Sequence, residues 1–400
     1  MERLTFSGAI LPEGSGSLSI AGSEIVDSRQ TTVRGLSEQP IADTGLVTAQ
    51  SRTRPGQHSK EIDASGFLIL PGLVDLHGDA FERHLAPRRG ALRSLGDGLR
   101  ALEIELAANG ITTAYLPQFW SWEGGMRGAD FAEDLCAAVA EHDGALDLRV
   151  QLRLDIACHA DLPRIGALIA RYGIDYLVLN DRLPHAALSE GRRPPRLDGQ
   201  ALRAGRSPAE HHTLMHRLHE TMPGAEAALA TWLPTLDGVR IGSHDDATPA
   251  VRDRYRELGA NIAEFPTTRE TAQAARNAGD ALVLGAPNVV RGGSHDRGVS
   301  AREMVAAGLC DALASDYHYP SLHHATLALE SEGMSLTAAW TLVSEAPAAM
   351  LGMVDRGVIA SGKRADLVIM EEATRRIVGT MAGGRFVHVA ASLAERLLVA

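Results

Sequence analysis

The chain of 400 residues is long enough for one barrel with an accessory domain, and its 45% hydrophobic and 22% charged residues are ordinary for a globular protein. This composition excludes disordered and low-complexity scaffolds. A formal net charge of −11 excludes a protein that binds nucleic acid through a broad basic surface. Long apolar runs, a leader pattern and closely spaced cysteines are all absent, which favours a cytoplasmic protein with no membrane partner.

The two ends of the chain share a pattern that the middle lacks. Residues 1–66 are rich in Gly, Ser and Thr and contain short alternating apolar runs, which are typical of strands joined by turns. Residues 351–400 show the same pattern. We therefore expect both termini to form one small β-sandwich domain.

Residues 67–350 alternate short apolar runs with helical patterns, as βα units do. Eight units predict an α/β fold, a (β/α)8 TIM-like barrel, because no Gly-x-Gly-x-x-Gly turn follows the first strand. The stretch 181–236 is too long for one connection and is expected over the active face. The predicted strands are 73–77, 111–116, 148–154, 175–179, 239–243, 261–264, 281–284 and 311–315, with helices at 95–108, 130–141 and 248–258 among others.

Metal-capable side chains stand where several of these strands end, and barrels of this kind carry their reactive groups at that edge. Each one alone has an ordinary explanation, since Asp after a strand often caps a helix or turn. Their joint occurrence in barrel order favours a site for one or two divalent ions. Imidazole with carboxylate suits Zn²⁺, Mn²⁺, Ni²⁺ or Fe²⁺, and Zn²⁺ is favoured here. The candidate ligands are His77, Asp79, Asp155, His244, Glu264 and Asp316.

The lysine content restricts how two ions would be bridged. Many barrel hydrolases use a carbamylated lysine, but Lys60 and Lys363 are the only lysines and both lie outside the predicted barrel strands. A bridge would therefore be a carboxylate, and Asp155 at the end of the third strand is the candidate.

The loop after the seventh strand combines paired glycines with an arginine. Loops at this place commonly hold phosphate, because successive backbone N–H groups converge on an anion and a guanidinium adds a fork of donors. The alternative is a plain Gly-Gly turn beside a surface arginine. The expected substrate-binding residues are Arg291, Gly292, Gly293, Ser294 and His295.

The runs 70–79, 243–248, 263–268, 285–295 and 315–317 together resemble the amidohydrolase superfamily and, within it, the PhnM family of α-D-ribose 1-methylphosphonate 5-triphosphate diphosphatases. The resemblance implies a metallohydrolase barrel that cuts the triphosphate of a ribosyl phosphonate between its α and β phosphoryl groups and releases pyrophosphate. It also implies that Asp316 is the catalytic general base. The partner would be a small phosphorylated substrate, and a homo-oligomer is one assembly to test.

The chain departs from that family around the expected substrate. Gln151 and Arg182 stand where the family has histidines, Asp155 stands where it has Glu, and an aromatic stretch at 118–122 follows the second strand. These changes keep a carboxylate at 155 and spare the other metal and anion candidates. They raise an alternative function, a paralogue that hydrolyses a C–N bond as a cyclic amidase or deaminase does. A barrel that binds a ligand without turnover is the non-enzyme alternative.

Overall fold

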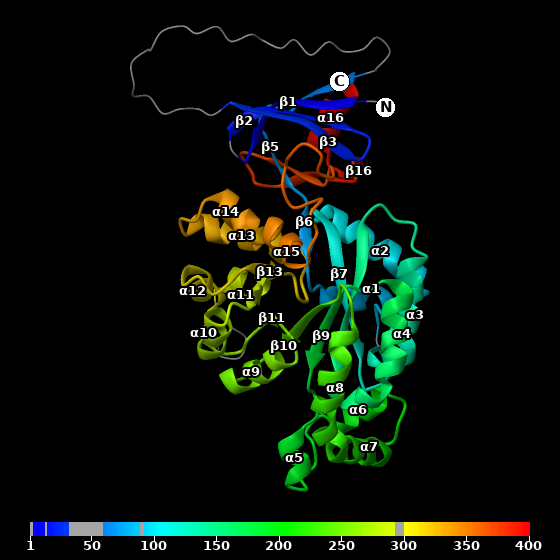
Figure 1. Cartoon of the computed structure of the whole chain (residues 1–400). Coiled ribbons are helices and arrows are strands. Elements are labelled where there is room, and N and C mark those ends of the chain that lie inside the picture. Colours follow the sequence, from blue (N-terminus) through cyan, green and yellow to red (C-terminus); the bar gives the residue numbers. More distant parts are fainter. Residues whose placement is uncertain (1–2, 13, 32–58, 89–91, 293–299) are drawn as a thin grey trace.

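The computed structural model describes residues 3–12, 14–31, 59–88, 92–292 and 300–400. Two sheets organise them, a barrel and a separate sheet built from both termini (Figure 1). The predicted fold class is confirmed. Within the described ranges, none of the helices combines the length and apolar character that crossing a membrane requires.

The barrel sheet contains eight strands in chain order, and every neighbouring pair is parallel. All eight predicted strands are present, with ends that differ by a few residues. The longest, β7, is buried along its whole length, as expected of a strand covered on both faces. The strands are β6 (Leu73–Asp75), β7 (Ile111–Trp120), β8 (Asp147–Asp155), β9 (Tyr176–Asn180), β10 (Arg240–His244), β11 (Ile262–Glu264), β12 (Ala281–Gly285) and β13 (Ala312–Ala314).

Helices follow the strands and cover the outside of the barrel (Figure 1). Local signals set their ends: Ser94 caps α2 by accepting from Asp97 N, and α4 ends at Gly173 in the left-handed region. The helices around the barrel are α1 (Glu82–Leu85), α2 (Leu95–Ala108), α3 (Ala129–Ala140), α4 (Leu162–Tyr172), α9 (Pro249–Glu257), α10 (Arg269–Asn277), α11 (Ala286–Arg291), α12 (Ala301–Ala306), α13 (Ser321–Ser331), α14 (Leu336–Thr341) and α15 (Glu345–Met350).

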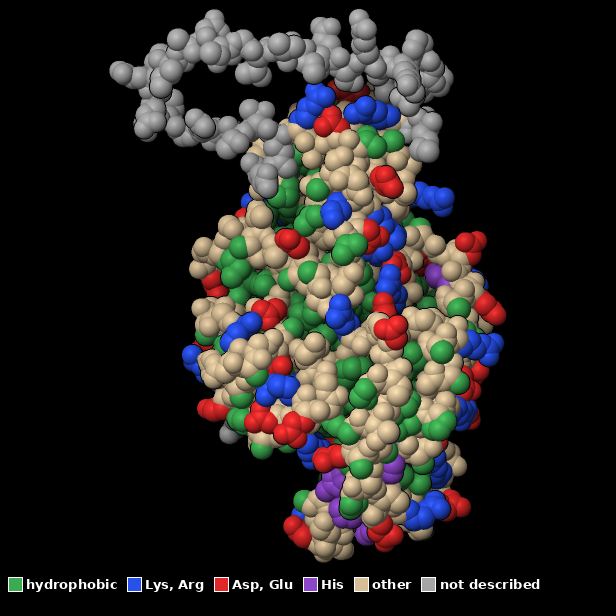
Figure 2. Space-filling model, viewed as in Figure 1, with side chains coloured by type: hydrophobic (Ala, Val, Ile, Leu, Met, Phe, Trp, Pro, Cys, Tyr) green, Lys and Arg blue, Asp and Glu red, His purple; other side chains and the backbone are tan. Residues whose placement is uncertain are grey.

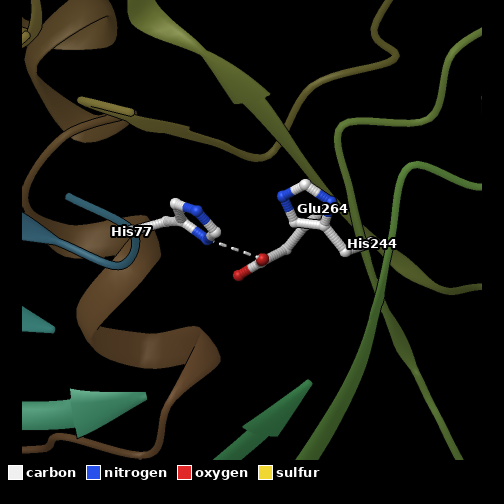
Figure 3. Close-up of side chains that lie close together, drawn as sticks. All are labelled: His77, His244 and Glu264. Carbon is white, nitrogen blue, oxygen red and sulfur yellow. Dashed lines mark hydrogen bonds and ion pairs between the residues drawn. The ribbon is translucent and has the colours of Figure 1, made fainter. Parts of the chain in front are cut away.

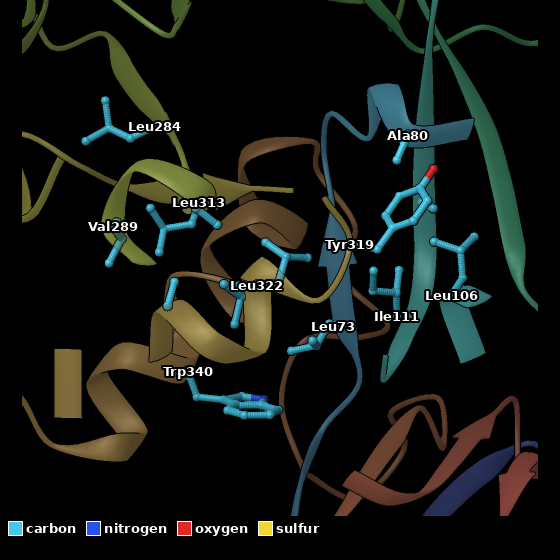
Figure 4. Close-up of a cluster of buried hydrophobic side chains, with 14 of the residues drawn as sticks. Leu73, Ala80, Leu106, Ile111, Leu284, Val289, Leu313, Tyr319, Leu322 and Trp340 are labelled. Carbon is cyan, nitrogen blue, oxygen red and sulfur yellow. The ribbon is translucent and has the colours of Figure 1, made fainter. Parts of the chain in front are cut away.

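Apolar side chains fill the layer between strands and helices. Figure 4 shows one such cluster, in which Leu313 of β13 packs near Leu322 of α13 and Val289 of α11. The Trp340 ring is also buried there, and its Nε1 donates to Pro71 O at 2.9 Å. This bond ties α14 to the strand that leads into the barrel.

The first and last barrel strands, β6 and β13, share no ladder within the described residues, and a buried carboxylate closes this seam. Ser315 donates from its backbone N to Asp75 Oδ1 at 3.0 Å and from its hydroxyl to Oδ2 at 2.6 Å. One step further along, Asp316 N donates to His77 O at 2.8 Å. Burial raises the pKa of Asp75, and its bonds to Ser315 oppose that rise. The seam therefore holds the ends of β6 and β13 together at the carboxyl edge.

The terminal sheet has a mixed topology, with β5 at the point where the two ends of the chain meet. β5 pairs antiparallel with β14 and meets β1 in parallel, and the Phe6 and Phe386 rings pack edge to face in the shared core. The division into domains at residues 66 and 350 stays a prediction. The elements are β1 (Arg3–Leu11), β2 (Gly14–Ala21), β3 (Glu24–Thr31), β4 (Ser59–Asp63), β5 (Phe67–Pro71), β14 (Leu367–Glu371), β15 (Ile377–Ala382), β16 (Arg385–Val389) and α16 (Ala391–Val399).

The long stretch after β9 folds into helices at the end of the molecule opposite the terminal sheet (Figure 1). Histidines gather there (Figure 2), and the His185 and His219 rings hold α5 and α7 together through an Nδ1 to Nδ1 hydrogen bond of 2.7 Å. Because this insertion follows the carboxyl end of β9, it lies on the side where the barrel strands end. Its helices are α5 (His185–Ser189), α6 (Leu197–Arg203), α7 (Pro208–Thr221) and α8 (Ala225–Trp232).

We expect Ser315→Ala to destabilise the protein, because it removes one of the hydrogen bonds to the buried Asp75 carboxylate. Losing a bond to a buried charge costs about 1–3 kcal/mol. The measurement is urea unfolding of the variant against wild type. Ser331→Ala, at an exposed hydroxyl on α13, is the control and should change the free energy of unfolding little. Equal effects of the two substitutions would contradict the proposed role of the seam.

Candidate active site

Three buried side chains meet inside the carboxyl end of the barrel. His77, His244 and Glu264 each offer a ligand atom, and these atoms lie within 4.8 Å of one another (Figure 3). His77 Nδ1 is 2.9 Å from Glu264 Oε2, and the His77 and His244 rings are 5.1 Å apart between centroids. Three of the six predicted ligands are therefore brought together.

Strand register explains this convergence. His244 and Glu264 end the adjacent strands β10 and β11 and are direct partners in the parallel ladder. His77 follows β6 and reaches Glu264 across the barrel interior. Gly78 then permits the tight turn, since a Cβ there would lie 2.6 Å from the Tyr319 ring and 2.7 Å from Asp75.

The second oxygen of Glu264 is held by two donors that sequence analysis did not assign to the site. Gln151 Nε2 donates to Glu264 Oε1 at 2.7 Å, and Tyr176 OH donates to the same atom at 2.6 Å. Gln151 also donates to Leu76 O at 3.0 Å. The signal for Gln151 is its spacing from Asp155. The two are four residues apart, and residues separated by an even number share a strand face. Tyr176, at the start of an apolar run, carries no such signal.

Electrostatics in this group favour opposite charges on the histidine and the carboxylates. Burial alone would lower the pKa of His77, but Glu264 and Asp79 outweigh it and raise the pKa to about 10. Burial likewise opposes ionisation of Glu264 and Asp79, yet His77 brings the pKa of both carboxyls below the ordinary value. Burial and the nearby Arg153 lower the pKa of His244. Metals bind a neutral imidazole and ionised carboxylates, so an ion bound at His77 would replace the proton that this raised pKa favours.

The backbone at this edge is strained. Asp245 and Phe265 directly follow β10 and β11, Asp316 lies two residues after β13, and all three have φ between 52° and 59°. This left-handed region is unfavourable for residues with a side chain, above all a bulky one such as Phe, and strained backbone clusters at functional sites. Three such residues at the carboxyl ends of barrel strands support the assignment of this edge as the site.

The donor set fits a divalent ion. Imidazole nitrogens and a carboxylate suit Zn²⁺ and related first-row ions, whose bonds to such ligands are about 2.0–2.2 Å long. Two buried polar atoms, His244 Nδ1 in the group and Asp79 Oδ1 beside it, have no hydrogen-bond partner among the described residues. His244 Nδ1 does lie 3.1 Å from Asp245 Oδ2, but without hydrogen-bond geometry. Asp79 Oδ1 and His244 Nδ1 therefore have no hydrogen bond to a described residue that would compete with an ion bound at this place.

Of the other predicted ligands, Asp79 and Asp316 lie beside this group. Asp79 Oδ1 lies 3.5 Å from His77 Nε2. Asp316 follows β13, and burial raises its pKa to about 6. Asp155 ends β8, where it accepts from Ser121 Oγ at 3.1 Å and from Ala157 N at 3.3 Å. Burial and the negative charge of Asp181 raise the pKa of Asp155 to about 7. Asp155 is thus outside the group of three, and its role as a bridge stays a prediction.

The predicted anion loop is only partly described. Arg291 ends α11, where its NH2 donates to Asn288 Oδ1 at 2.8 Å and its guanidinium lies 5.8 Å from the centre of the Tyr317 ring. Gly292 is the helix C-cap, with φ of 71°. Tyr317 directly follows Asp316, so Arg291 lies at the same edge as the predicted base. Gly293, Ser294 and His295 lie outside the described residues.

Both lysines lie away from the site. Lys60 Nζ donates to Leu397 O at 2.7 Å and Lys363 Nζ to Val354 O at 2.6 Å. Neither reaches the barrel interior.

Imidazoles and carboxylates that converge at the carboxyl edge of a barrel are the arrangement expected of a metal-dependent barrel enzyme, and comparison with known proteins gives the superfamily. The Amidohydrolase family matches residues 97–388, so the chain belongs to this superfamily. It is 33% identical over 329 residues to the α-D-ribose 1-methylphosphonate 5-triphosphate diphosphatase of Escherichia coli K12, a match that spans 79% of this chain and 86% of that protein. Within the superfamily the chain is therefore PhnM-like.

Solved structures share the fold at low identity. The β-aspartyl dipeptidase of Fervidobacterium islandicum AW-1 superimposes with a TM-score of 0.58 at 14% identity, over 97% of each chain. A triazine hydrolase variant superimposes with a TM-score of 0.60 at 15% identity, over 99% of this chain and 98% of the other. Identities this low support the architecture alone.

We expect His77→Ala and His244→Ala each to lose bound metal and most activity, because each removes one of the three ligands that converge within the described part of the chain. Elemental analysis of the purified variants gives the metal content directly. His388→Ala, in β16 of the terminal sheet, is the matched control and should keep its metal. Full occupancy in both site variants would rule out the metal centre as assigned.

Activity should not depend on added bicarbonate. A carbamylated lysine needs carbon dioxide to form, and both lysines lie outside the barrel interior. The check is a rate measurement in degassed buffer with and without bicarbonate. Rescue of activity by bicarbonate would contradict a carboxylate-based centre.

Proposed function

We propose that this protein is a divalent-metal-dependent diphosphatase that hydrolyses the triphosphate of a ribosyl phosphonate and releases pyrophosphate, with Zn²⁺ as the favoured ion. The observation that carries the proposal is the 33% identity to the E. coli diphosphatase over 86% of that protein's length. The site chemistry supports it, since imidazoles, carboxylates and an arginine stand at one edge of the barrel.

Each residue has a role in this proposal. His77, His244 and Glu264 would hold the ion, while Gln151 and Tyr176 keep the Glu264 carboxylate in place. A divalent ion at this place would neutralise phosphoryl charge and make a water molecule more acidic. Asp316, at the neighbouring strand end, would accept the proton of the attacking water as general base.

Charge recognition distinguishes this function from its alternative. A triphosphate carries several negative charges, and removing them from water requires fixed donors aimed at the phosphoryl oxygens. Arg291, at the end of α11, would supply such donors through its guanidinium. A neutral cyclic amide, the substrate of the alternative C–N hydrolase, makes no comparable demand.

We expect Arg291→Ala to reduce kcat/KM for a phosphorylated substrate by roughly 30- to 1000-fold, the effect of losing a charge-assisted contact in a desolvated site. Metal content should stay unchanged, because Arg291 is not among the converging ligands. Pyrophosphate release measures the first quantity and elemental analysis the second.

Two results together would overturn the diphosphatase proposal. They are a protein that pyrophosphate does not inhibit and an Arg291→Ala variant that matches wild type on its best substrate. Ammonia release from cyclic amides would then make the C–N hydrolase the better description.

A further inference from the structure

A group of arginines surrounds one phenylalanine ring beside the metal candidates. The guanidinium carbons of Arg153, Arg127 and Arg182 lie 4.1, 4.5 and 5.1 Å from the centre of the Phe119 ring. No two of these carbons can therefore be farther apart than about 9.6 Å, the sum of the two longest distances. Positive charges this close repel one another, since the separation does not exceed a Debye length of about 10 Å. We call this group the Phe119 arginine cluster.

Neighbouring strands and a fixed loop build the cluster. Phe119 is near the end of β7, Arg153 is in β8, and Arg182 follows β9. Arg127 stands on the loop after β7, and Gln118 Nε2 fixes that loop by donating to Phe119 O and Met126 O, both at 2.8 Å. The aromatic stretch and Arg182, two of the departures from the family, thus meet in one place.

Protein carboxylates use only part of the cluster's hydrogen-bonding capacity. Glu123 accepts from Arg127 NH1 at 2.6 Å and from Arg182 Nε at 3.3 Å, and its Oε1 also accepts from Gln200 at 3.0 Å. The terminal nitrogens of Arg182 donate to no described residue. Both arginines are partly exposed, with 31% of the Arg127 side chain and 26% of the Arg182 side chain accessible, so a dissolved ligand can reach them.

The innermost member is buried without adequate partners. The Arg153 side chain is 3% exposed, and its contacts to His77 Nε2, Asn180 Oδ1 and Asp79 Oδ1 are long, at 3.5, 3.3 and 3.6 Å. Arg153 Nε and Asn180 Nδ2 are both buried and have no hydrogen-bond partner among the described residues. Buried donors are normally satisfied, and a buried charge without close partners is costly. An unsatisfied guanidinium N–H and an unsatisfied amide N–H on neighbouring residues are the kind of donors that bind an oxyanion.

We propose that the Phe119 arginine cluster, with Asn180, is a substrate subsite for an oxyanion, a phosphoryl, phosphonyl or carboxylate group. This inference rests on the proposed function in that it places the subsite beside the same metal group. It assigns Arg182 and Arg127 as specificity-determining residues. The substrate then carries anionic groups on two sides of the centre, one toward Arg291 and one toward Phe119.

The test is calorimetric titration of the full-length protein with inorganic pyrophosphate, which measures binding without turnover. Arg182→Gln and Arg127→Gln should each weaken binding about tenfold or more, because each removes a charge-assisted donor. Arg164→Gln is the matched control: Arg164 also stacks on an aromatic ring of β7, that of Trp120 at 5.1 Å, but is paired with Glu133 and Asp130. The affinity of the Arg164→Gln variant for pyrophosphate should stay within twofold of wild type.

Glu123→Gln separates ligand binding from a structural role. It removes the carboxylate that holds Arg127 and Arg182, so an anion subsite should bind pyrophosphate at least as tightly as before, with the fold checked by thermal unfolding. The proposal is overturned if Glu123→Gln weakens binding as much as Arg182→Gln does, or if both arginine variants bind like wild type. Titration with malonate distinguishes a carboxylate from a phosphoryl ligand. Since no turnover is measured, an inactive diphosphatase would leave this result standing.

Discussion

A carboxylate buried inside the barrel is the constraint on which the site depends. Glu264 is 1% exposed, and an isolated charge in such a place is too costly to persist. Residues from three other strands compensate this charge. His77, after β6, forms an ion pair with it, and Gln151 of β8 and Tyr176 of β9 donate hydrogen bonds to it. Removing any one partner leaves part of a buried charge unsatisfied, so a substitution at one of these side chains affects the others.

The same constraint links catalysis to barrel closure. His77 can reach Glu264 only if β6 stands at its place in the circle, and the Asp75 bonds to Ser315 hold it against β13. The backbone bond from Asp316 to His77 then aligns the predicted base with the predicted ligand. A polar seam at this point therefore serves both the fold and the geometry of the site.

Much of the architecture could be predicted from the sequence because it depends on local patterns. Short apolar runs predict all eight barrel strands, and residue type at strand ends indicates His77, His244 and Glu264 as candidate metal ligands. The contacts made across the barrel were beyond such reasoning. Tyr176 looks like a core residue until the fold brings its hydroxyl to Glu264, and the hydrogen bond from Ser121 to Asp155 likewise could not be predicted from spacing. These outcomes depend on depth and side-chain direction, which sequence spacing does not specify.

The departures from the family pattern have a common location. Phe119, Gln151 and Arg182 belong to β7, β8 and the end of β9, which are consecutive in the barrel. His77 follows β6, and His244 and Glu264 end β10 and β11, so these three lie on either side of that arc. Substitution on the first set can alter what the substrate meets while the metal donors stay in place. The two arcs meet through hydrogen bonds from Gln151 and Tyr176 to Glu264 and through the contact between Arg153 and His77. Because Gln151 still satisfies Glu264, the change at that position preserves the buried carboxylate, and the arc from β7 to β9 is free to carry a different recognition surface.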